Sequence, residues 1–323
     1  MSRRRPSKYH GLLPVYKKAG PTSHDVVDMA RKALGERRIG HTGTLDPLAE
    51  GLLLLCVGQA TRLQQFLLLW EKKYEGEIRL GWATTTYDSE GEAADPRGEP
   101  PVLDQSAVDK LAVRFRGEFE QVPPPYSAKK IAGKKLYELA RSGEKVAPEP
   151  KMVHVKELEL SVLEPTLLAV RTTTSTGFYV RSLAHDIGIE LGCGAHLERL
   201  HRAAIGPYTV DKALPQEALI AAANADEIIG GPAWVALGEA ALPFPEVELN
   251  STSSERFSNG QEIVVFSPGI EGVAPESSIV VRGPDRRLLG IGSVRAVLAR
   301  GRTLNIAPAM VLGAATAIAP ERK

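Results

Sequence analysis

Apolar and polar positions in the first part of the chain predict a helix, a loop and a buried strand. The apolar residues of the helix recur at helical spacing: Val26, Val27, Ala30 and Leu34. Thr22 and Asp25 form a capping-box pattern at its start, and it ends at Gly35. Residues 40–51 contain three glycines and a proline without either period, which predicts a loop. The apolar run Leu52–Val57 after it predicts a buried strand.

The middle of the chain alternates between strand-like and helix-like patterns. A strand with one buried face begins at Tyr74, and its alternating positions are Gly76, Ile78, Leu80 and Trp82. Residues 84–101 are rich in Thr, Asp, Gly and Pro and predict a surface loop before a helix around 108–115. Leu167–Thr174 predicts a strand that leads into a helix with one apolar face: Val180, Leu183, Ala184, Ile187 and Leu191. Tyr179 and Arg181 therefore fall at the start of that helix.

Beyond about Pro245 the composition changes to short β-prone segments separated by Gly and Pro. The segments are Glu262–Phe266, Ser278–Arg282, Leu288–Val294 and Thr303–Ile306. They predict a small, β-rich C-terminal domain over 246–323, after a larger domain over 1–245. The 323 residues, of which 43% are hydrophobic, suffice to build two such cores.

Charge is spread unevenly along the chain, although the net charge is only +1. Residues 1–45 contain ten Lys and Arg against three acidic residues, and a second basic cluster occupies 126–151 between two groups of prolines. We interpret 126–151 as an insertion that stands off the core. Basic segments of this kind can follow a phosphate backbone, and two solvated faces explain the charge equally well.

Several classes of protein are excluded by missing patterns. No apolar run approaches the length of a membrane helix, and the N-terminus lacks the features of a secretory signal, so we expect a cytoplasmic protein. The two cysteines, Cys56 and Cys193, have no metal-site spacing, and we expect no metal. The chain has no Gly-Lys-Ser/Thr phosphate loop, no His-Glu-x-x-His and no Gly-x-Ser-x-Gly. An NTPase, a zinc protease and a lipase-like hydrolase are therefore disfavoured.

The loop over 40–51 holds a carboxylate suited to chemistry, Asp46. Pro47 restricts the residue before it to an extended conformation, which would present the Asp46 side chain from a stiff loop. Glycines on either side allow a large substrate to approach the backbone. A turn in which Asp46 caps a neighbouring amide explains an isolated Asp-Pro pair at least as well.

The whole string around Asp46 is more specific than the pair. Residues 38–53, RIGHTGTLDPLAEGLL, closely resemble the catalytic motif of the TruB-type tRNA pseudouridine synthases. The resemblance continues in family order through further blocks: KY at 73–74, SAKKIAGKKLYE at 127–138, GFYVRSL at 177–183 and LGCGAHLERL at 191–200. These blocks cover most of residues 10–210.

The resemblance implies roles for the residues that match the motifs. Asp46 resembles the family's catalytic aspartate, Tyr74 the tyrosine that stacks on the target base, and Arg181 the arginine that pairs with the aspartate. Tyr74 is also our candidate for the group that removes the C5 proton. Isomerising uridine to pseudouridine keeps every atom, so a carboxylate nucleophile suffices and no cofactor is expected.

Further residues match the family's substrate contacts. His41 resembles the histidine that fills the space left by the extruded base, Tyr179 is a second stacking candidate, and Leu200 resembles an apolar wall of the pocket. The insertion over 126–151 corresponds to the family's thumb, which clamps the T-arm of tRNA, and contributes Lys129 and Lys130 as phosphate contacts.

The implied fold is an α+β catalytic domain on a mixed, largely antiparallel sheet, followed by a PUA-like RNA-binding domain. We expect modification of the T-loop uridine of tRNA, position 55, by a monomer that needs no protein partner. Two alternatives remain: a guide-RNA-dependent pseudouridine synthase and a non-catalytic tRNA folding chaperone. A two-carboxylate glycosidase is a third possibility, but Glu50 is the only nearby acid and nothing in the sequence pairs it with Asp46.

Overall fold

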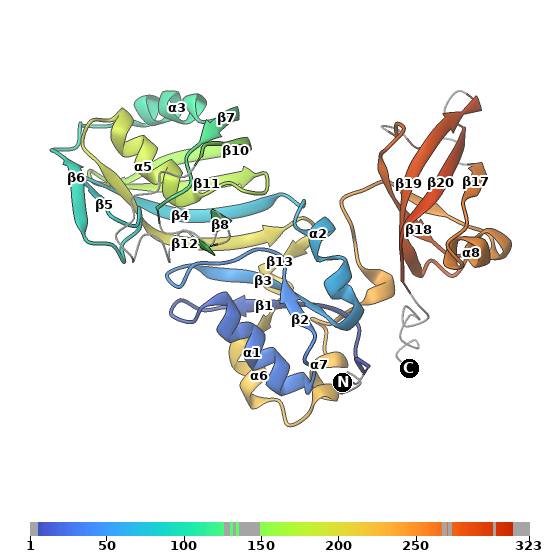
Figure 1. Cartoon of the computed structure of the whole chain (residues 1–323). Helices are drawn as coiled ribbons and strands as arrows, with labels where there is room; N and C mark the ends of the chain where they lie inside the picture. The colour runs from blue at the N-terminus through green and yellow to red at the C-terminus, as the bar shows by residue number, and fades with distance from the viewer. Residues whose placement is uncertain are drawn as a thin grey trace.

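The computed structural model describes residues 6–125, 130–131, 134–135, 149–266, 270, 273–299 and 302–312, with only the backbone at 130–131 and 134–135. One large sheet dominates it, with strand order β14-β1-β3-β12-β4-β11-β10-β7 (Figure 1). Its main strands are β1 (Gly11–Lys17), β3 (Glu50–Val57), β4 (Lys72–Leu80), β7 (Gly117–Gln121), β10 (Lys151–Glu164), β11 (Leu167–Thr174), β12 (Ala195–Ile205) and β14 (Leu214–Pro215). The pairs β1–β14 and β3–β12 are parallel and the others along this path are antiparallel, which confirms a mixed, largely antiparallel sheet.

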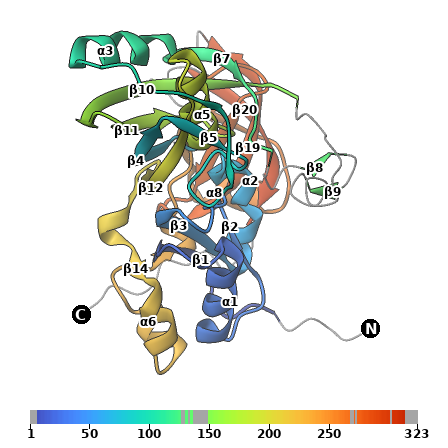
Figure 2. The same ribbon diagram turned by 90° about the vertical axis from the view of Figure 1, so that its left-hand side faces the viewer.

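Shorter elements complete this part of the molecule. The strands are β2 (Ile39–His41), β5 (Trp82–Thr84), β6 (Ala93–Arg97), β8 (Lys130–Ile131), β9 (Lys134–Lys135), β13 (Tyr208–Thr209) and β15 (Val235–Ala236). The α-helices are α1 (Ser23–Leu34), α2 (Gln64–Leu67), α3 (Gln105–Arg114), α5 (Val180–Glu190), α6 (Gln216–Ala221) and α7 (Ala225–Ile229). Figure 2 shows α1 and α6 at one end of the sheet and α3 at the other, with β8 and β9 standing off to one side.

The first helix forms where its pattern predicts it. The Thr22 hydroxyl accepts a hydrogen bond from the Asp25 amide, and the Asp25 carboxylate accepts one from the Thr22 amide, which completes the capping box. Gly35 ends the helix in a left-handed conformation, with φ at 59°. Its apolar face packs against the sheet: Val26, Val27, Ala30 and Leu34 are buried in one core with Leu13 and Val15 of β1.

Strand β3 is buried on both faces. Leu53, Leu55 and Val57 belong to the core beneath α1 and α5, whereas Leu52, Leu54 and Cys56 belong to a second core. This second core contains residues of the C-terminal sheet: Val280, Leu288, Ile291, Met310 and Leu312. The predicted buried strand at Leu52–Val57 is therefore confirmed, and an apolar run without alternation is what a strand covered on both faces requires.

The C-terminal segment forms a five-stranded sheet of order β16-β18-β19-β20-β17. Its strands are β16 (Glu246–Glu248), β17 (Ile263–Phe266), β18 (Ser278–Arg282), β19 (Leu288–Leu298) and β20 (Thr303–Val311). This confirms a small β-rich unit, although the division at residue 245 stays a prediction. Helix α8 (Ser251–Ser258), capped by the Asn250 side chain, was not predicted, because Phe257 is the only large apolar residue in its short sequence.

Three expectations from the sequence were wrong in detail. The predicted loop over 40–51 begins within β2 and ends within β3. Strand β2 forms because it pairs with the C-terminal end of β3, a contact that the local sequence pattern does not reveal. The strand expected to start at Tyr74 starts at Lys72, and Trp82 lies in β5, because Gly81 at φ 114° turns the chain between the two strands. The expected loop over 84–101 contains β6, which pairs with β5. In the described part of the chain, no helix has the length and apolarity to cross a membrane.

Candidate active site

A cavity of about 350 Å³ brings together most of the residues that the sequence singled out. Its lining includes Asp46, Tyr74, Tyr179, Arg181 and Leu200. They come from the loop before β3, from β4, from the start of α5 and from β12. The volume lies in the range of about 300–1,000 Å³ that is usual for ligand pockets. Segments far apart in the sequence therefore converge on one site.

The loop that carries Asp46 is fixed to α1 and to its own turn. The Ser23 hydroxyl donates a hydrogen bond to the carbonyl of Leu45 (2.9 Å) and accepts one from the Leu45 amide (2.8 Å). The Ala49 amide donates to the Asp46 carbonyl at 3.1 Å, which closes the turn. The backbone on both sides of Asp46 is thus held by partners that do not depend on its side chain.

A buried lysine, Lys17, also holds this loop in place. Its side chain has no exposed surface, and its ammonium group donates to the carbonyls of Asp46 (3.1 Å) and Ala49 (2.6 Å), among others. Burial lowers the pKa of Lys17 to about 8. The sequence did not single out this residue, because nothing in its local sequence signals that a lysine here is buried.

A buried arginine on β12, Arg202, also holds this loop in place. Its guanidinium donates to the carbonyls of Leu52 (2.8 Å), Gly43 (3.0 Å) and Thr44 (3.3 Å). Strand β3 comes close to β12 here because Gly51, at φ 107°, has no side chain: a Cβ would lie 2.4 Å from the Arg202 carbonyl oxygen. The last glycine of the motif is therefore required for this close approach.

The Asp46 carboxylate forms an ion pair with Arg181, with 2.9 Å between Oδ2 and Nε. The Arg181 side chain is 5% exposed and that of Asp46 is 33% exposed, so the carboxylate retains a surface on which a substrate can bind. Burial raises the pKa of Asp46 above its ordinary value, Asp88 adds to the shift, and Arg181 opposes it. This geometry agrees with the pairing that the sequence motifs implied.

Asp88 is a second carboxylate at this site, which sequence reasoning missed. Its side chain is 4% exposed, and its Oδ2 lies 3.2 Å from Nη1 of Arg181. The Thr86 hydroxyl and the Glu90 amide also donate to it. Arg181 is therefore held between two carboxylates. Asp88 falls within residues 84–101, whose Thr- and Asp-rich composition we interpreted as a surface loop.

The aromatic and apolar candidates line the same cavity as the ion pair. Tyr74 on β4 is half-buried, and Leu200 on β12 is 8% exposed. Tyr179 precedes α5, and the Gln121 side chain bonds both its amide (2.8 Å) and its carbonyl (3.1 Å). These contacts fix the start of the helix that carries Arg181.

Three predicted substrate-binding residues are not among these lining residues. His41 lies at the end of β2, where its Nδ1 accepts a hydrogen bond from the Gly43 amide at 3.3 Å. Lys129 lies outside the described residues, as does most of the predicted thumb over 126–151. Of Lys130 only the backbone, in β8, is described. Their roles stay predictions.

Cations dominate the charged lining of the cavity. Its charged lining consists of four cations, Lys72, Lys151, Arg181 and Arg202, and Asp46 is the only acidic residue among the described lining residues. Burial lowers the pKa of Lys72 to about 8, and its ammonium group donates to the Leu68 carbonyl. A site with this balance attracts an anionic substrate.

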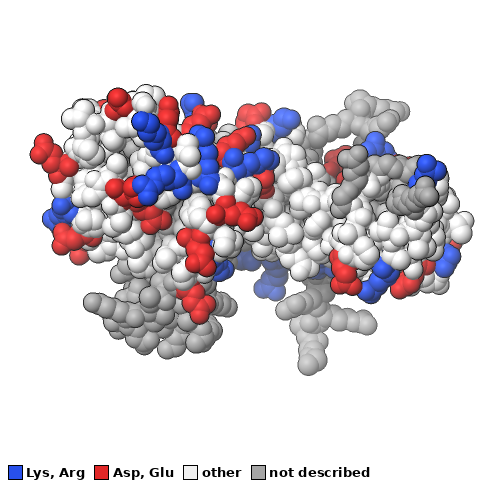
Figure 3. Space-filling view, turned by 90° about the horizontal axis from the view of Figure 1, so that it is seen from above, with Lys and Arg blue, Asp and Glu red and all other residues white. Residues whose placement is uncertain are grey.

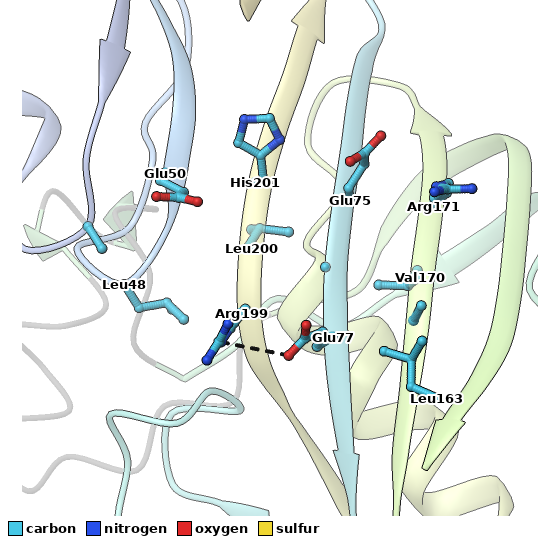
Figure 4. A pocket seen from close by; sticks show the side chains of 13 residues that line it. Leu48, Glu50, Glu75, Glu77, Leu163, Val170, Arg171, Arg199, Leu200 and His201 are labelled. Atoms are coloured by element: carbon cyan, nitrogen blue, oxygen red, sulfur yellow. Dashed lines mark ion pairs between the residues drawn. The ribbon is translucent and has the colours of Figure 1, made fainter. Parts of the chain in front are cut away.

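A second cavity, of about 560 Å³, is lined by residues of β3, β4, β11 and β12, including Leu200, which also lines the first cavity (Figure 4). Because side chains alternate along a strand, Glu75 and Glu77 of β4 point away from the face that presents Tyr74. Arg199 pairs with Glu77 there, and Glu50 lines the same hollow. Glu50 therefore belongs to a different cavity from Asp46, which argues against pairing these two acids for glycoside hydrolysis.

One face of the molecule differs from the cationic cavity. Figure 3 shows Lys and Arg side chains interspersed with Asp and Glu on this face of the larger part of the molecule. Among the described residues that line the cavity with Asp46, by contrast, cations outnumber acids.

A carboxylate paired with a buried arginine lines a cavity that also contains tyrosines and further cations, an arrangement suited to an enzyme with an anionic substrate. The description "TruB family pseudouridylate synthase (N terminal domain)" matches residues 31–180, and "tRNA pseudouridylate synthase B C-terminal domain" matches 181–233. A tRNA pseudouridine synthase B of Burkholderia lata is 45% identical over 254 residues, 78% of this chain and 77% of the relative. One of Cupriavidus metallidurans is 41% identical over 291 residues, 88% and 91% of the two chains. The chain belongs to the TruB family of pseudouridylate synthases.

Solved structures agree with the fold. A chain of an H/ACA RNP bound to a substrate RNA containing 2'-deoxyuridine has a TM-score of 0.70 at 22% identity, over 93% of this chain and 84% of that chain. A chain of a Cbf5-Nop10-Gar1 complex has a TM-score of 0.71 at 24% identity, with the same coverage. At these identities the likeness concerns the fold alone, and it confirms the predicted pseudouridine synthase architecture.

Proposed function

We propose that this protein isomerises uridine to pseudouridine at position 55 of the T-loop of tRNA, with Asp46 as the nucleophile. The observation that carries the proposal is the Asp46–Arg181 pair, at 2.9 Å, in a cavity whose other charged lining residues are cations. The curated relatives named tRNA pseudouridine synthase B support tRNA as the substrate.

The chemistry needs no atom beyond those of the substrate and water. The N1–C1′ bond breaks, a C5–C1′ bond forms, the C5 hydrogen leaves as a proton and N1 gains a proton. Arg181 holds the Asp46 carboxylate ionised and oriented, because a cation beside a carboxylate favours its charged form.

The target uridine must leave its base stack to reach Asp46. Tyr74 would stack on the extruded base, and such stacking contributes about 1–3 kcal/mol per base. Leu200 supplies an apolar contact, and the exposed Lys151 lines the same cavity and would bind a phosphate. We further propose that the chain acts as a monomer on the T-arm without a protein partner.

The test is incubation of the purified chain alone with an unmodified tRNA transcript. Pseudouridine should form at one position and should be lost when that uridine is replaced by cytidine. Asp46→Asn should abolish the product and leave RNA affinity within about tenfold, since phosphate contacts dominate binding. Glu50→Gln is the matched control, because Glu50 lines the other cavity, and it should retain activity.

Each alternative predicts a different result. A guide-RNA-dependent enzyme would form no product without a guide RNA. A tRNA folding chaperone would bind the transcript and leave its uridines unchanged. A two-carboxylate glycosidase would lose activity in Glu50→Gln as well as in Asp46→Asn.

A further inference from the structure

Tyr87 has a left-handed backbone conformation directly before Asp88. Its φ is 65°, a value that residues other than glycine rarely adopt and that an aromatic residue adopts only where its surroundings enforce it. The Leu197 amide donates to the Tyr87 carbonyl at 3.0 Å, and the Tyr87 amide donates to the Thr84 carbonyl at 3.3 Å. The turn is thereby fixed to β12 and to β5.

The ring of Tyr87 stacks on His185 of α5. The ring centroids are 3.8 Å apart and the planes differ by 7°, close to parallel. Burial lowers the pKa of His185, which favours a neutral imidazole, and its Nδ1 has no hydrogen-bond partner among the described residues. The stacked ring is therefore a principal contact of the His185 side chain.

The same turn and the same helix meet at Arg181. Arg181 precedes His185 by four residues, so both side chains lie on one face of α5, one turn apart. Its Nη1 donates to the Thr86 carbonyl (3.1 Å) and to the Asp88 carboxylate (3.2 Å). The residues on both sides of Tyr87 thus contact Arg181, and the aromatic pair adds another link between turn and helix.

We propose that Tyr87 is a positioning residue for catalysis: its stacking on His185 locks the turn that presents Asp88 to Arg181, and so aims the guanidinium at Asp46. The proposal rests on the proposed function, because Asp46 and Arg181 are the reacting pair in it. Tyr87 acts through Asp88 and needs no contact with the substrate.

The test compares Tyr87→Asn with Tyr87→Phe. Asparagine tolerates a positive φ, so Tyr87→Asn removes the ring without adding backbone strain, whereas phenylalanine keeps the ring. Tyr87→Asn should lower kcat about two- to tenfold, the range that loss of one stacked pair supports, and leave KM unchanged. Tyr87→Phe should recover kcat. An unchanged kcat in Tyr87→Asn, with or without a lower Tm, would overturn the proposal.

A double-mutant cycle tests the route through Asp88. If Tyr87 acts by placing Asp88, the loss of kcat caused by Tyr87→Asn should disappear in an Asp88→Asn background. An equal loss in both backgrounds contradicts that route. A wild-type chain that makes no pseudouridine would instead contradict the proposed function.

A crystal structure of Tyr87→Asn tests the positioning role independently of activity. We expect the contact between Asp88 and Arg181 to be lost in this variant, and an unchanged contact rejects the proposal.

Discussion

Asp88→Asn is the most informative perturbation of the site, because it removes one of the two carboxylates that hold Arg181. The contact is a charge-assisted hydrogen bond at 3.2 Å, and the Asp88 side chain is only 4% exposed. Such bonds contribute about 1.5–3 kcal/mol. If this free energy is lost from the stabilisation of the transition state, kcat should decrease about 10- to 150-fold. RNA affinity should change little, since Asp88 is absent from the described lining of the cavity.

The same variant should also shift the pH profile in a defined direction. The charge of Asp88 raises the pKa of Asp46, so its removal should lower that pKa and move the acid limb of the rate to lower pH. Single-turnover release of tritium from C5-labelled tRNA, measured across pH, reports both effects. Asp109→Asn is the matched control, because Asp109 is exposed on α3 and contacts the Gln105 side chain. A rate within twofold of wild type, or an acid limb at higher pH, would refute the reasoning.

Two further predictions concern the catalytic loop. In the wild-type enzyme the pKa of Asp46 is raised above the ordinary aspartate pKa of about 3.9. As the pH falls, the carboxylate should therefore take up its proton, and the reaction rate should fall, at a pH above that value. A reaction rate that stays unchanged down to about pH 4 would contradict this. Lys17→Met should lower the free energy of unfolding in urea by about 2–4 kcal/mol, because buried loop carbonyls lose their donor. Lys18→Met, at an exposed pair with Glu217, should change it by less than about 1 kcal/mol, and equal effects of the two variants would exclude the proposed role of Lys17.

Local patterns predicted the elements whose signals lie within one segment. The capping box at Thr22, the end of the helix at Gly35 and the apolar run of β3 each depend on neighbouring residues, and each is confirmed. The start of α5 was placed correctly for the same reason. The pairing of Asp46 with Arg181 was anticipated from the family resemblance of the motifs that carry them, and the local pattern alone does not give it.

Contacts between distant segments could not be predicted in this way. Strand β2 exists only because it pairs with the end of β3, and Asp88 joins the site only because its turn packs on β12. Lys17 and Arg202 are polar residues whose burial follows from the loop carbonyls they satisfy. Nothing in the local composition separates such buried cations from the solvent-exposed lysines and arginines elsewhere in the chain.

The two-sided burial of β3 has a consequence for any shortened form of this protein. Leu52, Leu54 and Cys56 share one apolar core with residues of the C-terminal sheet, and the next residues toward the N-terminus form the loop that carries Asp46. Deleting 246–323 would remove Val280, Leu288, Ile291, Met310 and Leu312 from that core and expose the apolar residues that pack against them. A shortened form of the protein would therefore need polar replacements at the newly exposed positions.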